Sequence, residues 1–320
     1  MTRHVSLFAG VGGFDLGLER AGWTSVGQVE VDRNCLSVLA RHWPDVPRWG
    51  DVRDVSADEL PDADLVSFGS PCQDLSIANT TRHGFDGRRS GLFLEAVRLL
   101  KGYVDAGRAP AFAVWENVPG ALSSSGGRDF AAALDALADV GSLVIDWRVL
   151  DAQHFGSAQR RRRLFVVAGF DRRLDPDRPL LLAEGRTRDG HPGALDASRP
   201  RTASRTGQRA EADGQRVFVK ARRAATVVDY ETWVADGPAP TLNVFDATAG
   251  HATVLVVTPT GVRRLTPREW ERLNGWPDDW TRYGHDGRTI RDGVRYRMVG
   301  NGVVGPVAEW IGRRLLEALP

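Results

Sequence analysis

The chain has 320 residues, of which 42% are hydrophobic, enough for a sizeable core in one large domain or two smaller ones. No apolar run approaches the roughly 18 residues of a membrane-spanning helix. Polar Arg3 and His4 lead directly into the first apolar run, so we expect no signal peptide. The only cysteines are Cys35 and Cys72, which predicts free thiols in a soluble, cytoplasmic protein. A formal net charge of +1 does not indicate a nucleic-acid partner.

Short apolar runs alternate with helical patterns through the first half of the chain. In 14–22, for example, Phe14, Leu18 and Ala21 share one helical face and Gly22 lies at the expected end. The predicted strands are 4–8, 24–29, 63–69, 111–118, 142–152 and 163–170, and the predicted helices are 14–22, 34–43, 92–104 and 129–141. This alternation predicts an α/β fold with a mainly parallel, doubly wound sheet.

The composition changes after Phe170, and we place a domain boundary near 172–180. Residues 172–223 hold 13 Lys or Arg against 7 Asp or Glu, almost all of the basic residues being Arg. Arginine suits bidentate contacts to phosphate and base edges. A GC-rich genome would also favour arginine over lysine, but it would not cluster the charges. Further predicted elements are strands at 216–221, 225–230 and 253–259, and an amphipathic helix over 301–320 with Val304, Val307, Ile311 and Leu315 in register.

A glycine-rich turn, "FAGVGG" at 8–13, joins the first predicted strand to the first helix. Glycines allow positive φ and close approach of the backbone to a ligand, and a helix N-terminus attracts negative charge. Glu30 ends the next strand, where a dinucleotide fold binds a ribose hydroxyl. Asp51 follows near another strand end. These residues alone fit a nicotinamide or flavin cofactor as well as another nucleoside cofactor.

Cys72 lies in "GSPCQDLS", just past the strand that ends near Phe68. Ligands of open α/β sheets bind outside the carboxyl ends of the strands, so this thiol is placed where chemistry usually occurs. A catalytic thiol needs nearby positive charge or a helix N-terminus to ionise. Cys35, inside an apolar helical face, is interpreted as inert. Residues 77–91 form a polar, glycine-bearing connection of the kind that closes over a substrate.

Two further charged motifs lie at strand ends. Glu116 follows an apolar strand in "WENVPG", where a buried glutamate must be paired, hydrogen-bonded or protonated. As an acid it could donate to a ring nitrogen. In "AQRRRRLFVV", alternation along a strand puts Arg161 and Arg163 on one face and Arg160 and Arg162 on the other. One pair could therefore face a cleft while the other meets phosphate or solvent.

In this order, "FAGVGG", "PCQ" at Cys72, "ENV" at Glu116 and "QRRRR" at Arg161 and Arg163 resemble the motifs of the cytosine-5 DNA methyltransferases of prokaryotic and phage restriction-modification systems. The segments 84–93, 263–280 and 296–304 are similar to other motifs of that family, and the similarity covers most of 5–170 and 263–315.

The resemblance implies a Rossmann-like S-adenosylmethionine-dependent methyltransferase domain in 1–175 and 295–320. It also implies a smaller target recognition domain of short strands and loops in 176–294.

The resemblance also assigns roles to residues at matching positions. Cys72 would be the nucleophile, Glu116 would face N3 of cytosine, and Arg161 and Arg163 would supply positive charge. S-adenosyl-L-methionine, with S-adenosyl-L-homocysteine as its product, would contact Phe8, Gly10, Gly12, Glu30, Val31, Asp51, Pro71 and Asn301. Double-stranded DNA would contact Gln73, Ser76, Arg88, Arg89 and Thr241. We expect no metal and no membrane contact, a monomer, and any cognate restriction endonuclease to be encoded separately.

The implied reaction explains these residue types. A thiolate that adds to carbon 6 makes carbon 5 of cytosine nucleophilic, an acid relieves the charge at N3, and cations stabilise it. The base has to leave the duplex first.

Three alternatives stay open on the sequence. A tRNA-directed branch of the same fold is disfavoured because "PCQDLS" lacks that branch's Cys-Phe-Thr element. A nicotinamide-dependent oxidoreductase leaves Cys72, Glu116 and the arginines unexplained, and a silent DNA-binding relative would not need those residues intact.

Overall fold

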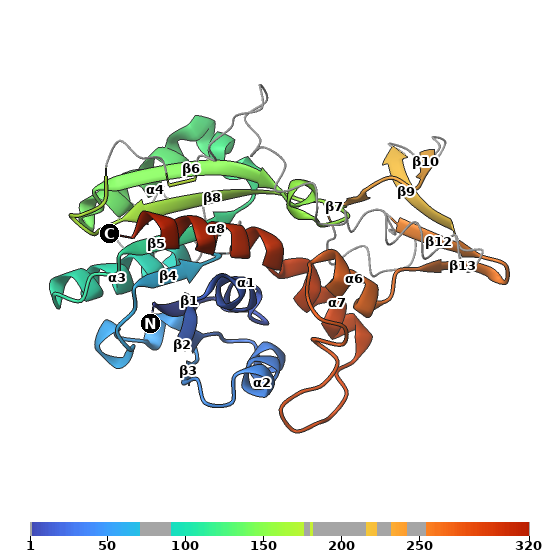
Figure 1. Cartoon of the computed structure of the whole chain (residues 1–320), viewed down its shortest axis with the longest axis horizontal. Coiled ribbons are helices and arrows are strands. Elements are labelled where there is room, and N and C mark those ends of the chain that lie inside the picture. The colour runs from blue at the N-terminus through green and yellow to red at the C-terminus, as the bar shows by residue number, and fades with distance from the viewer. Residues whose placement is uncertain are drawn as a thin grey trace.

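The computed structural model describes residues 2–70, 91–175, 180–181, 216–222, 232–241 and 254–319. Among them, a seven-stranded sheet forms the centre of the molecule, in the strand order β3-β2-β1-β4-β5-β8-β6 (Figure 1). Its strands are β1 (Arg3–Leu7), β2 (Thr24–Val29), β3 (Arg48–Trp49), β4 (Leu65–Phe68), β5 (Phe112–Asn117), β6 (Val144–Asp151) and β8 (Arg162–Gly169). The first five pair in parallel, with Leu7 of β1 opposite Val29 of β2 and Phe68 of β4. The predicted mainly parallel sheet is confirmed.

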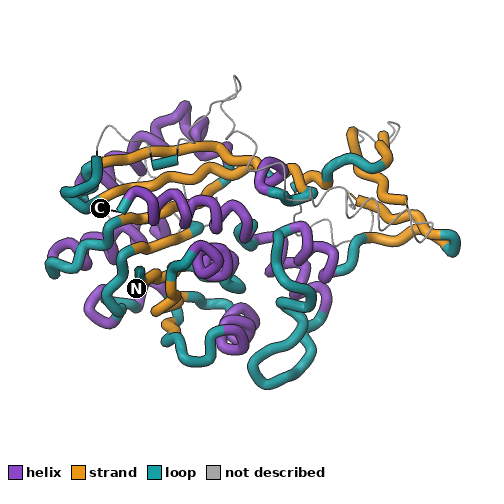
Figure 2. The backbone as a smooth tube through the Cα atoms, in the orientation of Figure 1, coloured by secondary structure: helices purple, strands orange, loops and turns teal. Residues whose placement is uncertain are grey.

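Helices cover both faces of this sheet (Figures 1 and 2). They are α1 (Gly13–Ala21), α2 (Arg33–His42), α3 (Gly91–Asp105), α4 (Arg128–Asp139) and, near the C-terminus, α8 (Gly305–Ala318). Leu18 of α1 and Ile311 of α8 belong to the buried cluster on one face, and Leu99 of α3 and Leu137 of α4 to the cluster on the other. The doubly wound arrangement therefore buries both faces of the strands, which explains their near-continuous apolar runs.

Strand β8 differs in direction from the first five strands, because it runs antiparallel to both β5 and β6. Only residues 152–161 connect β6 to β8. A parallel crossover needs a dozen or more residues, so this short connection returns the chain in the opposite direction. The consequence is that Arg161 and Arg163, at the start of β8, reach the same edge of the sheet as the carboxyl end of β5.

A smaller antiparallel sheet lies beside the large one, in the order β10-β9-β12-β13. Its strands are β9 (Arg216–Arg222), β10 (Thr232–Ala235), β12 (Val254–Thr258) and β13 (Gly261–Arg264); a two-stranded pair joins β11 (Ala239–Pro240) to β7 (Gln159–Arg160). The strands predicted at 216–221 and 253–259 are confirmed as β9 and β12, and the one predicted at 225–230 lies outside the described residues. The domain limits at 176 and 294 stay a prediction.

The chain returns to the large sheet through α6 (Pro267–Leu273), α7 (Asp292–Asn301) and α8. The prediction of one helix over 301–320 was wrong at its start: α7 ends at Asn301, Gly302 is extended, and α8 begins at Gly305. The predicted apolar register is correct, because all four of its residues are buried. At this break the backbone carbonyls of Gly300 and Gly302 bind a distant arginine (see below).

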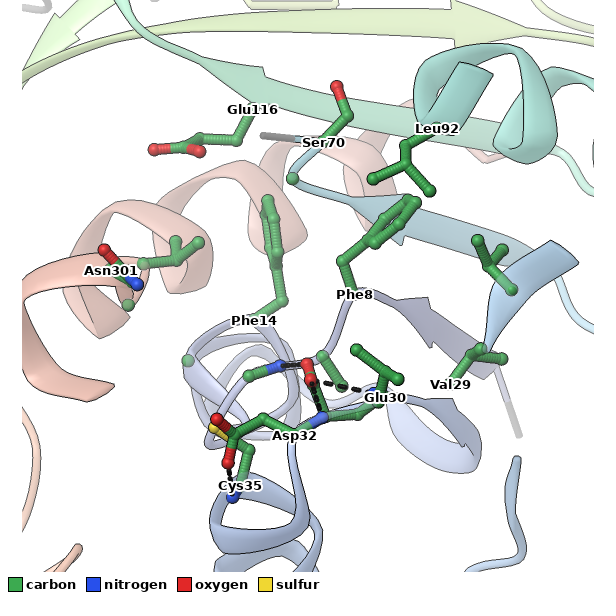
Figure 3. A pocket seen from close by; sticks show the side chains of 18 of the residues that line it. Phe8, Phe14, Val29, Glu30, Asp32, Cys35, Ser70, Leu92, Glu116 and Asn301 are labelled. Atoms are coloured by element: carbon green, nitrogen blue, oxygen red, sulfur yellow. Dashed lines mark hydrogen bonds between the residues drawn. The ribbon is translucent and has the colours of Figure 1, made fainter. Parts of the chain in front are cut away.

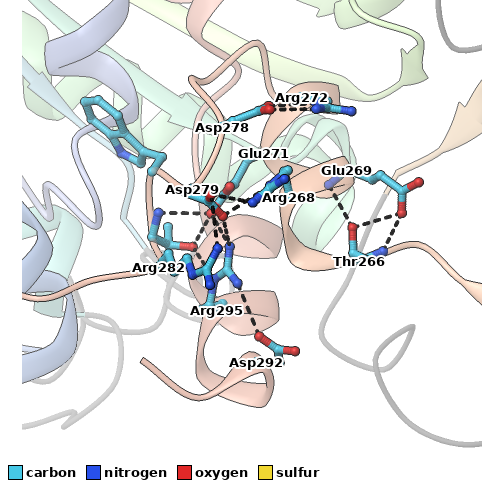
Figure 4. A network of polar contacts seen from close by, with 12 residues as sticks. Thr266, Arg268, Glu269, Glu271, Arg272, Asp278, Asp279, Arg282, Asp292 and Arg295 are labelled. Carbon is cyan, nitrogen blue, oxygen red and sulfur yellow. Dashed lines mark hydrogen bonds and ion pairs between the residues drawn. The ribbon is translucent and has the colours of Figure 1, made fainter. Parts of the chain in front are cut away.

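Buried charge fixes α6 against α7 (Figure 4). Glu271 of α6 is fully buried and accepts a hydrogen bond from Nη2 of Arg295, 3.0 Å away on α7. Glu271 also accepts from the backbone N of Thr281 at 2.9 Å. A buried carboxylate needs such partners, so this network determines how the segment after α6 folds back. No helix in the described part of the chain is long and apolar enough to cross a membrane.

Candidate active site

A cavity of about 860 Å³ lies at the carboxyl ends of β1, β2, β4 and β5 (Figure 3). Residues distant in the sequence meet on its walls because parallel strands bring their carboxyl ends to one edge of a sheet. The predicted site residues that line it are Phe8, Gly10, Glu30, Val31, Asp51, Glu116, Arg161, Arg163 and Asn301.

The glycine turn after β1 forms the floor of this cavity. Gly10 adopts a φ of +58°, and a Cβ at this position would meet no atom within 4 Å, so the backbone faces open space. Gly12 was also predicted to contact the cofactor, but it is not among the lining residues. Its φ is +82°, and a Cβ there would lie 2.5 Å from Cη2 of Trp43. The missing side chain of Gly12 therefore makes room for the Trp43 ring.

Glu30 is held rigidly at the end of β2. Its carboxylate accepts hydrogen bonds from the backbone N of Gly10 at 2.7 Å, of Val31 at 2.9 Å and of Asp32 at 2.8 Å (Figure 3). Three backbone donors are enough to fix the position and orientation of a carboxylate. Glu30 thus ties the glycine turn to the start of α2 and presents an acceptor to the cavity.

Val31 and Asp51 form an apolar and an acidic part of the same wall. Val31 is 66% exposed, which is unusual for a valine and leaves apolar surface bare at the cavity. Asp51 accepts from the backbone N and from Nε of Arg53, at 3.0 Å and 2.9 Å. These hydrogen bonds lower the pKa of Asp51 below its ordinary value, so the group is a carboxylate at neutral pH.

Glu116 and Arg163 form a half-buried ion pair elsewhere on the cavity wall. Nε of Arg163 lies 3.1 Å from Oε1 of Glu116, and their side chains are 17% and 13% exposed. The other carboxyl oxygen, Oε2, lies next to Gly69, where a Cβ would be 3.4 Å away. The ion pair therefore orients the carboxyl group, with Oε2 directed toward Gly69.

Arg161 is almost fully buried, at 3% exposed. Its Nη1 donates to the carbonyl of Gly300 at 3.1 Å and its Nη2 to the carbonyl of Gly302 at 3.0 Å. Burial, and then the neighbouring charge of Arg163, lower its pKa to about 9, so the group stays cationic at neutral pH. The predicted alternation holds, because Arg160 and Arg162 are exposed while Arg161 and Arg163 line the cavity.

Among the lining residues that the sequence did not reveal are Asn117, Arg297 and Met298. The spacing of α7 could have indicated the last two, since positions three and four residues before Asn301 share its helical face. Cys35 also lines the cavity, although burial raises the pKa of its thiol, which agrees with an inert role.

The structure does not describe most of the remaining predicted residues. Pro71, Cys72, Gln73, Ser76, Arg88 and Arg89 lie outside the described residues. Ser70 and Gly91, which flank that segment, both line the cavity. Thr241 does not line it; its Oγ1 donates to the carbonyl of Arg160 at 3.1 Å.

A family model and several known proteins match nearly the whole length of this chain. A family model for C-5 cytosine-specific DNA methylases matches residues 2–189 and 195–317. The Type II methyltransferase M2.BsuMI of Bacillus subtilis (strain 168) is 32% identical over 318 residues, covering 98% of this chain and 75% of that protein. The Type II methyltransferase M.Bsp6I of Bacillus sp. (strain RFL6) is 27% identical over 338 residues, covering 100% of both.

Solved structures show the same fold at lower sequence identity. The S. pombe Dnmt2 methyltransferase has a TM-score of 0.68 at 15% identity, covering 99% of each chain. The Entamoeba histolytica methyltransferase EhMeth has a TM-score of 0.65 at 14% identity, covering 100% of this chain and 99% of that one. Since the family model matches nearly the entire sequence, the chain belongs to the C-5 cytosine-specific DNA methylases and is a DNA cytosine-5 methyltransferase.

Proposed function

We propose that this chain transfers the methyl group of S-adenosylmethionine to carbon 5 of a flipped-out cytosine in a specific short sequence of duplex DNA, through a covalent Cys72 adduct at carbon 6. The observation that carries the proposal is one cavity with two chemically distinct parts. Glu116 lies on one side with Arg161 and Arg163 nearby, and Glu30 lies on the other (Figure 3). The first part suits a polar base and the second suits a nucleoside cofactor.

The part of the cavity around Glu30 carries polar and apolar groups that match those of S-adenosylmethionine. The bare surface of Val31 suits one face of an adenine ring, and the Asp51 carboxylate suits its amino group. Glu30, fixed by three backbone donors, suits the ribose hydroxyls. Asn301 at the end of α7 offers an amide to the amino-acid end. When bound, the cofactor supplies an electrophilic methyl group on its sulfonium.

The first part performs the steps on cytosine. The thiolate of Cys72 forms a bond to carbon 6, and the electron pair displaced from the ring is neutralised when N3 takes up a proton through the Glu116 carboxyl group. Carbon 5 would then take the methyl group that the cofactor supplies, while the bond between that methyl group and the cofactor's sulfur breaks. Loss of the carbon 5 proton to a base, return of the N3 proton to Glu116 and departure of the thiolate restore the aromatic ring. Ser70 and Gly91 at the cavity support this position for the nucleophile.

The two arginines stabilise the charge that develops on the ring. Arg163 orients the Glu116 carboxyl group through its Nε. Arg161 places a cation in a largely water-excluded position, where a charge has more effect than in water.

We further propose that 176–294 recognises the target sequence, because its strands carry basic residues beside the cavity domain. As in Type II systems, a separate restriction endonuclease would cut the unmethylated site.

A covalent trap tests the mechanism. Fluorine at carbon 5 cannot leave as a cation, so a duplex with 5-fluorocytosine at the target holds the adduct after methyl transfer. Mass spectrometry of the wild-type complex should place the crosslink on Cys72. Cys72→Ser should form no adduct, whereas the matched control Cys35→Ser should still form one. An adduct on Cys35, or one that survives Cys72→Ser, would refute the assignment of the nucleophile.

Label transfer tests the substrate. Methyl-labelled cofactor and unmethylated duplex DNA should yield 5-methylcytosine at one short motif. Label found only in tRNA offered in parallel would contradict the DNA proposal.

A further inference from the structure

Trp276 lies under the cavity, just past the end of α6, and only 4% of it is exposed. The tip of its indole ring occupies space that a side chain at residue 302 would need. A Cβ on Gly302 would lie 2.5 Å from Cζ2 of Trp276, and closer still to Cη2. On the side of the glycine turn, a Cβ on Gly13 would lie 3.3 Å from Cζ2. The ring is therefore inserted between the first and the last cavity-lining segments of the chain.

Trp276 also holds the last segment through a hydrogen bond. Its Nε1 donates to the carbonyl of Val303 at 3.1 Å. Two residues earlier, Nδ2 of Asn274 donates to the carbonyl of Val299 at 2.8 Å, and the Asn274 carbonyl accepts from the N of Gly305 at 2.9 Å. The residues that follow α6 thus fix both ends of the connection between α7 and α8.

That connection carries the groups that meet the substrates. The carbonyls of Gly300 and Gly302 are the two acceptors of the Arg161 guanidinium. Asn301, between them, lines the cavity. A shift of the backbone at Gly302 therefore displaces the cation and the amide together.

Helix α6 is also tied to the small antiparallel sheet. Arg263 of β13 forms a bidentate ion pair with Glu269 of α6, with Nη1 2.9 Å from Oε2 and Nη2 3.0 Å from Oε1. Glu269 in turn closes the N-terminus of α6 in a capping box with Thr266. A continuous set of contacts runs from β13 through α6 to Trp276.

We propose that Trp276 is a positioning residue for methyl transfer: its indole seats the backbone at 300–303 and so places Arg161 at the base and Asn301 at the cofactor. The proposal rests on the roles that the proposed function gives to Arg161 and Asn301. The proposal depends on the fit between the two side chains: the indole ring of Trp276 leaves room only for glycine at position 302.

A double-mutant cycle in the full-length chain tests this pairing. Gly302→Ala should lower the single-turnover rate of methyl transfer about 10- to 100-fold, because misplacing a reacting group by about 1 Å has that effect. Its affinity for S-adenosylhomocysteine, measured by calorimetry, should fall in parallel. Trp276→Phe removes the tip of the ring. In the Trp276→Phe background, the added Gly302→Ala substitution should therefore lower the rate by less than about threefold. The difference between its effects in the two backgrounds is the coupling, and it has the size measured for residues in contact.

Trp270→Phe is the matched control, since Trp270 is a buried tryptophan of α6 whose ring packs on Tyr296. It should change thermal stability while leaving the rate and the affinity within about twofold, because it is Trp276, and not Trp270, that occupies the space beside Gly302. Equal losses from Gly302→Ala in both backgrounds, or a loss in Trp270→Phe as large as in Trp276→Phe, would overturn the proposal.

If Gly302→Ala does not fold, recovery of a folded, active protein in the double variant supports the pairing, and failure to recover refutes it. Arg161→Lys distinguishes a failure of the proposed function from a failure of this inference. An unchanged rate of methyl transfer in Arg161→Lys would refute the role that the proposed function gives to Arg161. The coupling between residues 276 and 302, in contrast, tests only whether Trp276 and Gly302 fit each other.

Discussion

Two glycines of one turn should respond differently to the same substitution: one should lose mainly stability and the other mainly affinity for the ligand. Gly12 has a φ of +82°, and left-handed backbone costs a residue with a side chain about 1–2 kcal/mol. Its Cβ would also overlap the ring of Trp43, and overpacking of a core typically costs about 1–3 kcal/mol more. Gly12→Ala should therefore lower the free energy of unfolding by about 2–5 kcal/mol.

Gly10 provides the comparison, because its φ is +58° but no atom lies within 4 Å of a Cβ placed there. Gly10→Ala should lower the free energy of unfolding by only the backbone cost of about 1–2 kcal/mol. Its methyl group would instead project toward the cavity that Gly10 lines, so it should weaken binding of S-adenosylhomocysteine.

Urea unfolding and calorimetric titration of both variants measure these two effects. Gly12→Ala should bind the ligand nearly normally once it is folded. The reasoning is refuted if Gly10→Ala is the less stable variant, or if Gly12→Ala loses affinity while keeping its stability.

Two buried groups give further predictions. Burial lowers the pKa of His4 in the folded protein to about 3. Between this value and the ordinary pKa of about 6.5, only the unfolded chain takes up the proton. The free energy of unfolding should therefore fall by up to about 1.4 kcal/mol for each unit by which the pH is lowered. His4→Gln should remove this contribution, and urea unfolding from pH 7 to pH 4 should show the stability gap to wild type shift in the variant's favour as the pH falls; parallel curves would contradict it. Glu271→Gln removes the fully buried carboxylate that pairs with the buried Arg295 and leaves that guanidinium only the more exposed Asp279 and Asp292, so it should lower the free energy of unfolding by up to about 3–5 kcal/mol. Asp278→Asn, which breaks the exposed pair with Arg272, should cost at most about 1 kcal/mol in the same measurement; similar losses in both would argue against burial as the cause.

Most strands of the large sheet could be predicted from the sequence, because short apolar runs that alternate with helical patterns are local signals. Strand β2, for example, was predicted at its observed bounds, Thr24–Val29. The direction of β8 was not stated, because the period of a strand is the same in both directions; only the short connection from β6 contains that information. The end of α7 was missed for a different reason. The predicted apolar register begins only at Val304 and does not mark where the preceding helix ends, and the local boundary signal, Pro306 at the start of α8, was not used.

In the candidate site, too, some residues could be predicted from local sequence and others depended on tertiary contacts. Glu30 and Glu116 were found because each ends an apolar strand, and strand ends converge at one edge. The position of Gly12 against Trp43 could not be read from the turn itself, where all three glycines look alike. Only a tertiary contact distinguishes the glycine that faces a ligand from the glycine that faces a ring.

The buried charge of Arg161 explains why the end of the chain has to return to the cavity. A cation taken out of water needs acceptors, and the structure supplies them from the carbonyls of Gly300 and Gly302. Those carbonyls are free to accept because the chain leaves helical geometry at Gly302, and α8 then anchors the segment by close packing on α1. At that contact a Cβ on Gly17 would lie 2.5 Å from Cβ of Ala308. The interruption between α7 and α8 therefore lets one short segment reach both parts of the cavity, which the proposed function assigns to the base and to the cofactor.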